Sequence, residues 1–210
     1  MAIQRLGSKG RNPGSFGDGE HRAHIRTGAF ELASGNKTFD AQFEEGEPVG
    51  VVVSHRQRGR RHVDRLRMLA EELWEQGLEP ALRPEAGELI QRSRAQGLRQ
   101  VLVTGAFDLA VAPLVRELGF DDCGANRLDL ADGRATGHLV PPVMAGAAKA
   151  GWIRAYAERE GLSLGSSYAY ADSLSDLPML SVVGRPTAVN PDAGLRRVAR
   201  EQGWPVLWLS

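Results

Sequence analysis

Residues 100–119 read QVLVTGAFDLAVAPLVRELG, and this stretch decides the predicted fold. Its first four residues form a short apolar run that is typical of a buried strand. Thr104 and Gly105 then turn the chain, and apolar residues at helical spacing predict a helix over 107–118 that stops at Gly119. A buried strand that leads directly into a helix is the repeating unit of α/β proteins, in which helices cover a mostly parallel sheet.

The chain from residue 49 onward alternates in the same way. Short apolar runs predict strands at 49–53, 168–171, 186–190 and 205–209, and two short strands over 124–140 that turn at Asp132-Gly133. Helical spacing and terminal glycines predict helices over 62–77, 84–97, 147–160 and 192–202, with a short helix that begins at Asp176. We therefore predict a three-layer α/β/α domain over residues 49–210. Residues 1–48 are glycine-rich and hold no strand or helix period for long, which predicts an irregular N-terminal arm.

The composition excludes several classes of protein. The 210 residues carry 26 Lys and Arg against 26 Asp and Glu, and this formal net charge of +0 argues against a bulk polyanion binder. A single cysteine, Cys123, excludes an internal disulfide framework and a cysteine-based zinc site. No apolar run approaches the roughly 20 residues that span a bilayer, and the first residues lack the apolar core of a secretory signal. We expect a cytoplasmic protein without a membrane partner.

Polar side chains stand where ligands bind in such sheets, at the carboxyl ends of the strands. Thr104 and Gly105 follow one predicted strand, and Asp172 follows another. Lys149 enters at the beginning of a helix, and Asp176 opens the short helix after Asp172. Free N–H groups at helix N-termini suit a phosphate, and carboxylates are hard ligands that suit Mg²⁺. The combination predicts a magnesium-dependent phosphate site.

At these residues the chain resembles the haloacid dehalogenase (HAD) superfamily, in its phosphoserine-phosphatase-like branch (subfamily IB). The stretch LVTGAFDLAVAPLVRELGFDD (102–122) is similar to the second motif of the family, and YADSLSDLPML (170–180) is similar to its acidic motif. Between them, residues 125–153 are similar to the hairpin and the lysine motif of the family. The resemblance covers roughly residues 58–208, and it implies a HAD-like Rossmannoid parallel sheet with a cap that is reduced or missing.

The resemblance also implies a role for each polar residue. Thr104 would bind phosphate with its hydroxyl, beside the amide of Gly105, and Lys149 would be the phosphate-binding lysine. Asp172 would bind Mg²⁺ directly, and Asp176 would support the metal site. The implied ligand is a small phosphorylated molecule.

The first motif of the family, a central strand that ends in Asp-x-Asp, has no counterpart, because no Asp-x-Asp occurs anywhere in the chain. In the family its first aspartate is the nucleophile and its second is the acid and base. Asp40 would place Gln42 at the acid position, and Asp18 would place Glu20 there. If Val49–Val53 fills the central strand, Ser54 stands at the nucleophile position; alternatively the central strand is absent.

Three functions remain open from the sequence. The first is a Mg²⁺-dependent phosphomonoester hydrolase whose catalytic nucleophile is unassigned. The second is a catalytically degenerate relative that binds phosphate and Mg²⁺ without turnover. The third, ranked below both, is nucleic-acid association through the basic run Arg56–Arg67, for which a solvated helix entry is the plainer explanation.

Overall fold

The computed structural model describes residues 2–5 and 62–209. Its strands are β1 (Ala2–Arg5), β2 (Arg99–Phe107), β3 (Asp122–Ala131), β4 (Arg134–Val140), β5 (Leu162–Ala171), β6 (Arg185–Val189) and β7 (Val206–Leu207). Its longer helices are α1 (Val63–Leu73), α3 (Pro84–Ala95), α4 (Asp108–Leu118), α5 (Ala147–Arg159) and α7 (Ala193–Gln202). Shorter helical pieces are the π-helical turn η1 (Trp74–Leu78), α2 (Glu79–Ala81), the 3₁₀ turn η2 (Leu174–Asp176) and α6 (Leu177–Leu180).

The described strands form one sheet in the order β4-β3-β2-β1-β5-β6-β7. The pairs β2–β3, β5–β6 and β6–β7 are parallel, as the alternation of strands and helices predicts. The pair β3–β4 is the expected antiparallel hairpin, and both residues of its turn, Asp132 and Gly133, have positive φ. The predicted α/β fold is confirmed.

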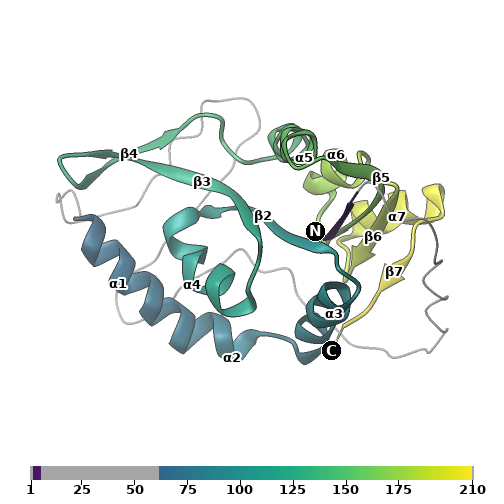
Figure 1. The fold of residues 1–210 in the computed structure, drawn as a ribbon, viewed down its shortest axis with the longest axis horizontal. Coiled ribbons are helices and arrows are strands. Elements are labelled where there is room, and N and C mark those ends of the chain that lie inside the picture. Colours follow the sequence, from purple (N-terminus) through teal and green to yellow (C-terminus); the bar gives the residue numbers. More distant parts are fainter. Residues whose placement is uncertain (1, 6–61, 210) are drawn as a thin grey trace.

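Helices cover both faces of the sheet, with α5 and α6 on one side and α1 to α4 on the other (Figure 1). On the first side, Ile153 of α5, Leu180 of α6 and Leu195 of α7 are fully buried against Ala169 and Ala188 of the sheet. Small residues on β5 and β6 let the helices approach closely, which brings the starts of α5 and α6 near the ends of the central strands. None of the described helices combines the length and the apolar character that a membrane crossing needs.

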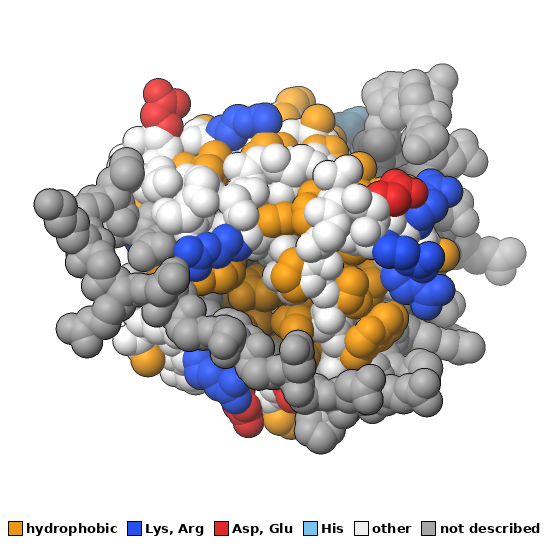
Figure 2. Space-filling view, turned by 90° about the vertical axis from the view of Figure 1, so that its right-hand side faces the viewer, with side chains coloured by type: hydrophobic (Ala, Val, Ile, Leu, Met, Phe, Trp, Pro, Cys, Tyr) orange, Lys and Arg blue, Asp and Glu red, His pale blue; other side chains and the backbone are white. Residues whose placement is uncertain are grey.

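The side of the molecule on which α7 and β7 lie carries exposed apolar surface. Figure 2 shows hydrophobic side chains gathered at the middle of this face, with charged side chains toward its rim. Trp208, which follows β7, is 41% exposed.

The centre of the sheet is the main departure from the sequence prediction. Residues 2–5, expected in an irregular arm, form β1, which lies antiparallel between β2 and β5. Neither open alternative, a central strand from Val49–Val53 or an absent strand, describes this arrangement; Val49–Val53 and Ser54 themselves lie outside the described residues. The physical reason is that the facing edges of β2 and β5 carry backbone groups that need partners, and any short extended segment can supply them.

The register of β1 limits how far it reaches toward the predicted site. Ala2 pairs with Gln100 of β2 and with Tyr168 of β5, and Arg5 pairs with Leu162 at the beginning of β5. The described residues of β1 therefore lie beside the amino-terminal part of β2 and along β5 from Leu162 to Tyr168. Thr104 lies four residues beyond Gln100, toward the carboxyl end of β2.

Candidate functional site

The centre of the candidate site is an ion pair between Lys149 and Asp176. Nζ of Lys149, in the first turn of α5, lies 2.5 Å from Oδ1 of Asp176, at the end of η2. The two side chains are only 13% and 12% exposed, so the pair is largely withdrawn from water. An ammonium has three N–H donors, and this contact uses one of them, which leaves Lys149 able to bind a further anionic oxygen.

Lys149 is also unusual within this chain. The other two lysines are Lys9 and Lys37, so Lys149 is the only lysine among residues 62–209, where the remaining basic side chains, histidine aside, are arginines. A lysine presents a compact point charge, whereas an arginine presents a broad planar fork. The first turn of α5 contains no acidic residue whose negative charge would repel an anion there.

Asp172 lies directly after β5, and its carboxyl group is electrostatically strained. Burial raises the pKa of Asp172, and the negative charges of Asp176 and Asp192 raise it further, while its own backbone hydrogen bond and the positive charge of Lys149 oppose the shift. A half-buried carboxylate with two acidic neighbours favours a bound cation or a proton. The structure thus brings Lys149 and Asp176 into contact and places Asp172 where the charges of both act on it.

Asp192 is part of this arrangement, although the sequence pattern predicted no role for it in the site. It caps α7: Oδ1 accepts from the N–H of Leu195 at 2.7 Å, and Oδ2 accepts from the N–H of Leu174 at 2.9 Å. Burial opposes ionisation, but these backbone hydrogen bonds outweigh it and lower the pKa of Asp192. Its own N–H donates to the carbonyl of Asp172 at 2.8 Å. Asp192 thus joins the start of α7 to the segment that carries Asp172.

Thr104 and Gly105 lie inside β2, in its carboxyl-terminal part, whereas the sequence pattern predicted them in a turn after a strand that ends at Val103. Oγ1 of Thr104 accepts from the N–H of Ala106 at 3.1 Å, which uses the oxygen as an acceptor and leaves the hydroxyl hydrogen free to donate. A Cβ added to Gly105 would lie 3.4 Å from the carbonyl oxygen of Met144, so the segment before α5 passes close to this glycine. Within residues 62–209, Thr104 makes no direct hydrogen bond to Lys149, Asp172 or Asp176; the two groups are joined through the Met144 segment.

Asn126 makes this connection, and sequence reasoning missed it. Its Nδ2 donates to the carbonyl of Gly105 at 2.6 Å, and its Oδ1 accepts from the N–H of Met144 at 2.7 Å. The signal available in the sequence is weak, because an asparagine inside a predicted hairpin strand is only an unfavourable strand residue until its neighbours in space are known.

The metal prediction finds partial support in the chemistry of the donors. Asp172 offers a carboxylate that a cation would stabilise, whereas Asp176 is held by Lys149. Within the described residues, no three His, Cys, Asp or Glu side chains are grouped so as to hold a metal ion. The donors fit one protein carboxylate contact to a magnesium ion, with phosphate and water oxygens as suitable further ligands.

The other candidates are less favourable or fall outside the structure. The nucleophile candidates Asp18, Asp40 and Ser54 lie outside the described residues, as does the first part of the run Arg56–Arg67. In the described part of that run, Arg65 lies 3.5 Å from Glu72 and Arg67 lies 3.2 Å from Asp64, all four exposed. These ion pairs agree with a solvated helix entry.

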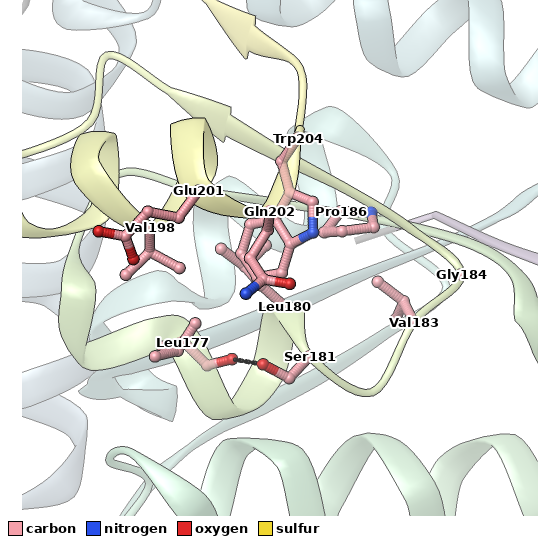
Figure 3. Close-up of a pocket in the computed structure, with 10 residues that line it drawn as sticks. All are labelled: Leu177, Leu180, Ser181, Val183, Gly184, Pro186, Val198, Glu201, Gln202 and Trp204. Carbon is pink, nitrogen blue, oxygen red and sulfur yellow. Dashed lines mark hydrogen bonds between the residues drawn. The ribbon is translucent and has the colours of Figure 1, made fainter.

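A hollow among the described residues lies apart from these groups. It measures about 570 Å³ and lies between α6, β6 and α7, where Leu180 and Trp204 line it beside Glu201 and Gln202 (Figure 3). The hydroxyl of Ser181 donates to the carbonyl of Leu177 at its edge. None of the predicted site residues lines this hollow, so its size does not identify it as the functional site.

A family model described as haloacid dehalogenase-like hydrolase matches residues 23–181. The chain belongs to this family. Phosphoserine phosphatase SerB1 of Mycobacterium tuberculosis is 39% identical to this HAD-like chain over 147 residues, which are 70% of the chain and 47% of that protein. The HAD-like chain spans about half the length of curated relatives that it matches.

Solved structures agree with the HAD-like assignment. A protein of unknown function from Bordetella pertussis Tohama I superposes with a TM-score of 0.66 and 31% identity, over 70% of this chain and 67% of that one. A phosphoserine phosphatase solved as a phospho-aspartyl intermediate analogue superposes with a TM-score of 0.53 and 26% identity, over 69% of each chain. The fold is therefore one that this chain shares with HAD-like proteins, a phosphoserine phosphatase among them.

Proposed function

We propose that this HAD-like chain binds a small phosphomonoester together with Mg²⁺, at the edge of the sheet where β2 and β5 end, and acts as a phosphatase. The observation that carries the proposal is the buried pair of Lys149 and Asp176 beside the half-buried carboxyl of Asp172. The ammonium of Lys149, held by Asp176, is suited to bind a phosphate anion, and the nearby carboxylate of Asp172 is suited to bind the metal cation that accompanies the phosphate.

The residues divide the work of binding. The free hydroxyl hydrogen of Thr104 donates to one phosphoryl oxygen, and the remaining N–H groups of Lys149 donate to another. Asp176 keeps the ammonium of Lys149 in place through the 2.5 Å contact. Asp172 is the carboxylate ligand to the ion; when bound, Mg²⁺ neutralises phosphoryl charge as it redistributes in the transition state.

A second candidate function is binding without turnover at the same site. Two observations favour it: the sequence contains no Asp-x-Asp, and the described central strand β1 has the sequence Ala-Ile-Gln-Arg, without a carboxylate. The relative solved as a phospho-aspartyl analogue indicates that hydrolysis in this family branch passes through an aspartate. In this chain the nucleophile would have to come from outside the described residues, where Asp18, Asp40 and Ser54 are the candidates.

The experiment that separates these functions is a phosphate-release assay with Mg²⁺ on phosphoserine and on a generic aryl phosphate. Turnover that Asp172→Asn reduces at least 100-fold supports the phosphatase, whose next test is alanine substitution of Asp18, Asp40 and Ser54 in turn. No turnover, together with phosphate binding that Lys149→Ala weakens, supports the binding protein. Absence of both turnover and phosphate binding would refute both candidates.

A further inference from the structure

A buried asparagine connects the two halves of the proposed site. Asn126, on β3, is 2% exposed, and both ends of its amide are engaged by backbone groups. One partner is the carbonyl of Gly105 on β2, and the other is the N–H of Met144, before α5. Unpaired polar groups in a buried position raise the free energy of the folded state. The amide of Asn126 is therefore held in the position in which both of its hydrogen bonds form.

The strand β2 needs this amide because it bulges at the site. Val103 pairs with Gly124 and Phe107 pairs with Asn126, so β2 advances four residues while β3 advances two. The extra residues at 104–106 fall out of the regular ladder, as in a β-bulge. Asn126 Nδ2 provides the hydrogen bond that a ladder partner would otherwise give to Gly105.

The peptide group between Gly105 and Ala106 is consequently held at both ends. Its carbonyl oxygen accepts from Asn126, and its N–H donates to Oγ1 of Thr104. This second bond orients the Thr104 hydroxyl, because the oxygen must face Ala106 while its hydrogen points elsewhere. The position of the proposed phosphate donor therefore depends on Asn126 through one peptide plane.

The other end of the asparagine amide acts on Lys149. Met144 stands five residues before Lys149, and the first turn of α5 begins with the bonds Ala148 N–H to Ala145 carbonyl and Lys149 N–H to Gly146 carbonyl. The same strand also seats the helix: a Cβ on Gly124 would lie 2.6 Å from the Trp152 ring, one helical turn after Lys149. Gly124 and Asn126 are two residues apart, so they share the face of β3 toward α5.

We propose that Asn126 is a positioning residue that sets the spacing between the Thr104 hydroxyl and the Lys149 ammonium, so that both meet one phosphoryl group. The inference rests on the proposed phosphate site, and it adds a residue that touches neither phosphate nor metal. Its effect is carried by the Gly105 carbonyl on one side and by the Met144 amide on the other.

The test compares two substitutions at Asn126 with a matched substitution elsewhere. Asn126→Asp keeps the acceptor for Met144 and loses the donor to Gly105, and Asn126→Leu loses both without adding a charge. The control is Asn190→Asp, because Asn190 is also buried and makes the same pair of bonds to the N–H and carbonyl of Leu209. The readouts are the dissociation constant for inorganic phosphate with Mg²⁺, amide hydrogen exchange at Met144 and Lys149, and the melting temperature.

We expect both Asn126 variants to bind phosphate at least tenfold more weakly, and Asn190→Asp to stay within twofold of the unmodified protein at a comparable loss of melting temperature. Exchange at Met144 should rise at least tenfold in Asn126→Leu and little in Asn126→Asp. Folded Asn126 variants that bind phosphate within twofold would overturn the proposal. If the unmodified protein binds no phosphate, the proposed function fails, and unchanged exchange at Met144 and Lys149 in Asn126→Leu would refute the positioning role separately.

Discussion

At the scale of single residues, the site contains a charged group whose surroundings disfavour its ionised form. The carboxyl of Asp172 is half-buried and faces two other acidic side chains, and its raised pKa is the sign of that cost. Asp192, nearby, has the opposite balance, because two backbone N–H groups stabilise its charge. Two aspartates on neighbouring segments thus contribute to stability with opposite signs.

Replacing Asp172 with Asn should therefore stabilise the metal-free protein at neutral pH, by about 0.5 kcal/mol or more. A raised carboxyl pKa means that the folded state holds the proton more tightly than the unfolded one, so ionisation destabilises the fold as the pH rises. The gain should shrink on acidification, as Asp172 becomes protonated in the unmodified protein. Thermal or urea unfolding at several pH values measures it.

The control is Asp192→Asn, which should destabilise the protein by about 1 kcal/mol, because the NH₂ group that replaces one carboxylate oxygen cannot accept the backbone N–H that this oxygen held. Equal signs for the two substitutions at neutral pH would contradict the electrostatic description of the site.

The sequence indicated candidate site residues within its motifs, but it did not indicate the hydrogen bonds that join them to other segments. Thr104, Lys149 and Asp172 could be named as candidates because strand ends and helix starts mark where ligands bind. Asn126 could not, because its role depends on a bulge in β2, and the bulge is visible only once the register with β3 is known. The bond from Asp192 to Leu174 likewise requires two segments to meet in space.

At the scale of elements, α5 carries Lys149 and is fixed by how closely it packs on β3. Gly124 lies beneath Trp152, and the ring of Trp152 stacks on Tyr156 with the ring centres 5.2 Å apart. Gly151, on the same helix, is exposed, and a Cβ there would meet nothing within 4 Å. The two glycines therefore differ in what a methyl group would do.

Gly151→Ala should stabilise the protein by about 0.5–1 kcal/mol, because alanine lowers the entropy lost on forming the helix. Gly124→Ala should destabilise it by about 1–3 kcal/mol, since Trp152 must move to make room. Gly124→Ala should also weaken phosphate binding, because α5 shifts with its lysine. Chemical unfolding and phosphate titration of the two variants test this, and a Gly124→Ala variant as stable as the parent would show that α5 is not seated in this way.

Element boundaries were predictable where glycines and turns mark them. Gly119 and Gly203 end α4 and α7 in left-handed conformation, and Asp132-Gly133 turns the hairpin. The strand β5 begins at Leu162, whereas the predicted strand covers only 168–171. The first half of β5 does not sustain an alternation of apolar and polar residues, so the sequence does not mark it as a strand. Local signals therefore located the elements and left their lengths to tertiary pairing.

At the scale of the whole molecule, the decisive feature is the strand at the centre of the sheet. Propensity alone favoured Val49–Val53, but Ala2–Arg5 occupies the place between β2 and β5, antiparallel to both. A four-residue run with one β-branched side chain carries too little signal for sequence reasoning to find it. Its partners lie about 100 and 160 residues away in the chain.

Ile3→Pro tests this central placement. A proline in a central strand cannot donate to the ladder and restricts the backbone, so we expect the free energy of unfolding to fall by about 2 kcal/mol or more. The comparison is Trp208→Pro, at an exposed position beyond the last strand, which should lower the free energy of unfolding by less. Unfolding in urea measures both, and an Ile3→Pro variant of unchanged stability would place β1 outside the folded core.

The central claim is that Lys149 and the groups around it bind a phosphoryl group, and calorimetric titration with inorganic phosphate in the presence of Mg²⁺ tests it most directly. Lys149→Met should weaken binding at least tenfold. Arg159→Met should leave phosphate binding within twofold. This substitution removes an equal charge from the far end of the same helix, where Arg159 pairs with Asp122. A protein that binds no phosphate, or that binds it equally well with methionine at position 149, would contradict the account.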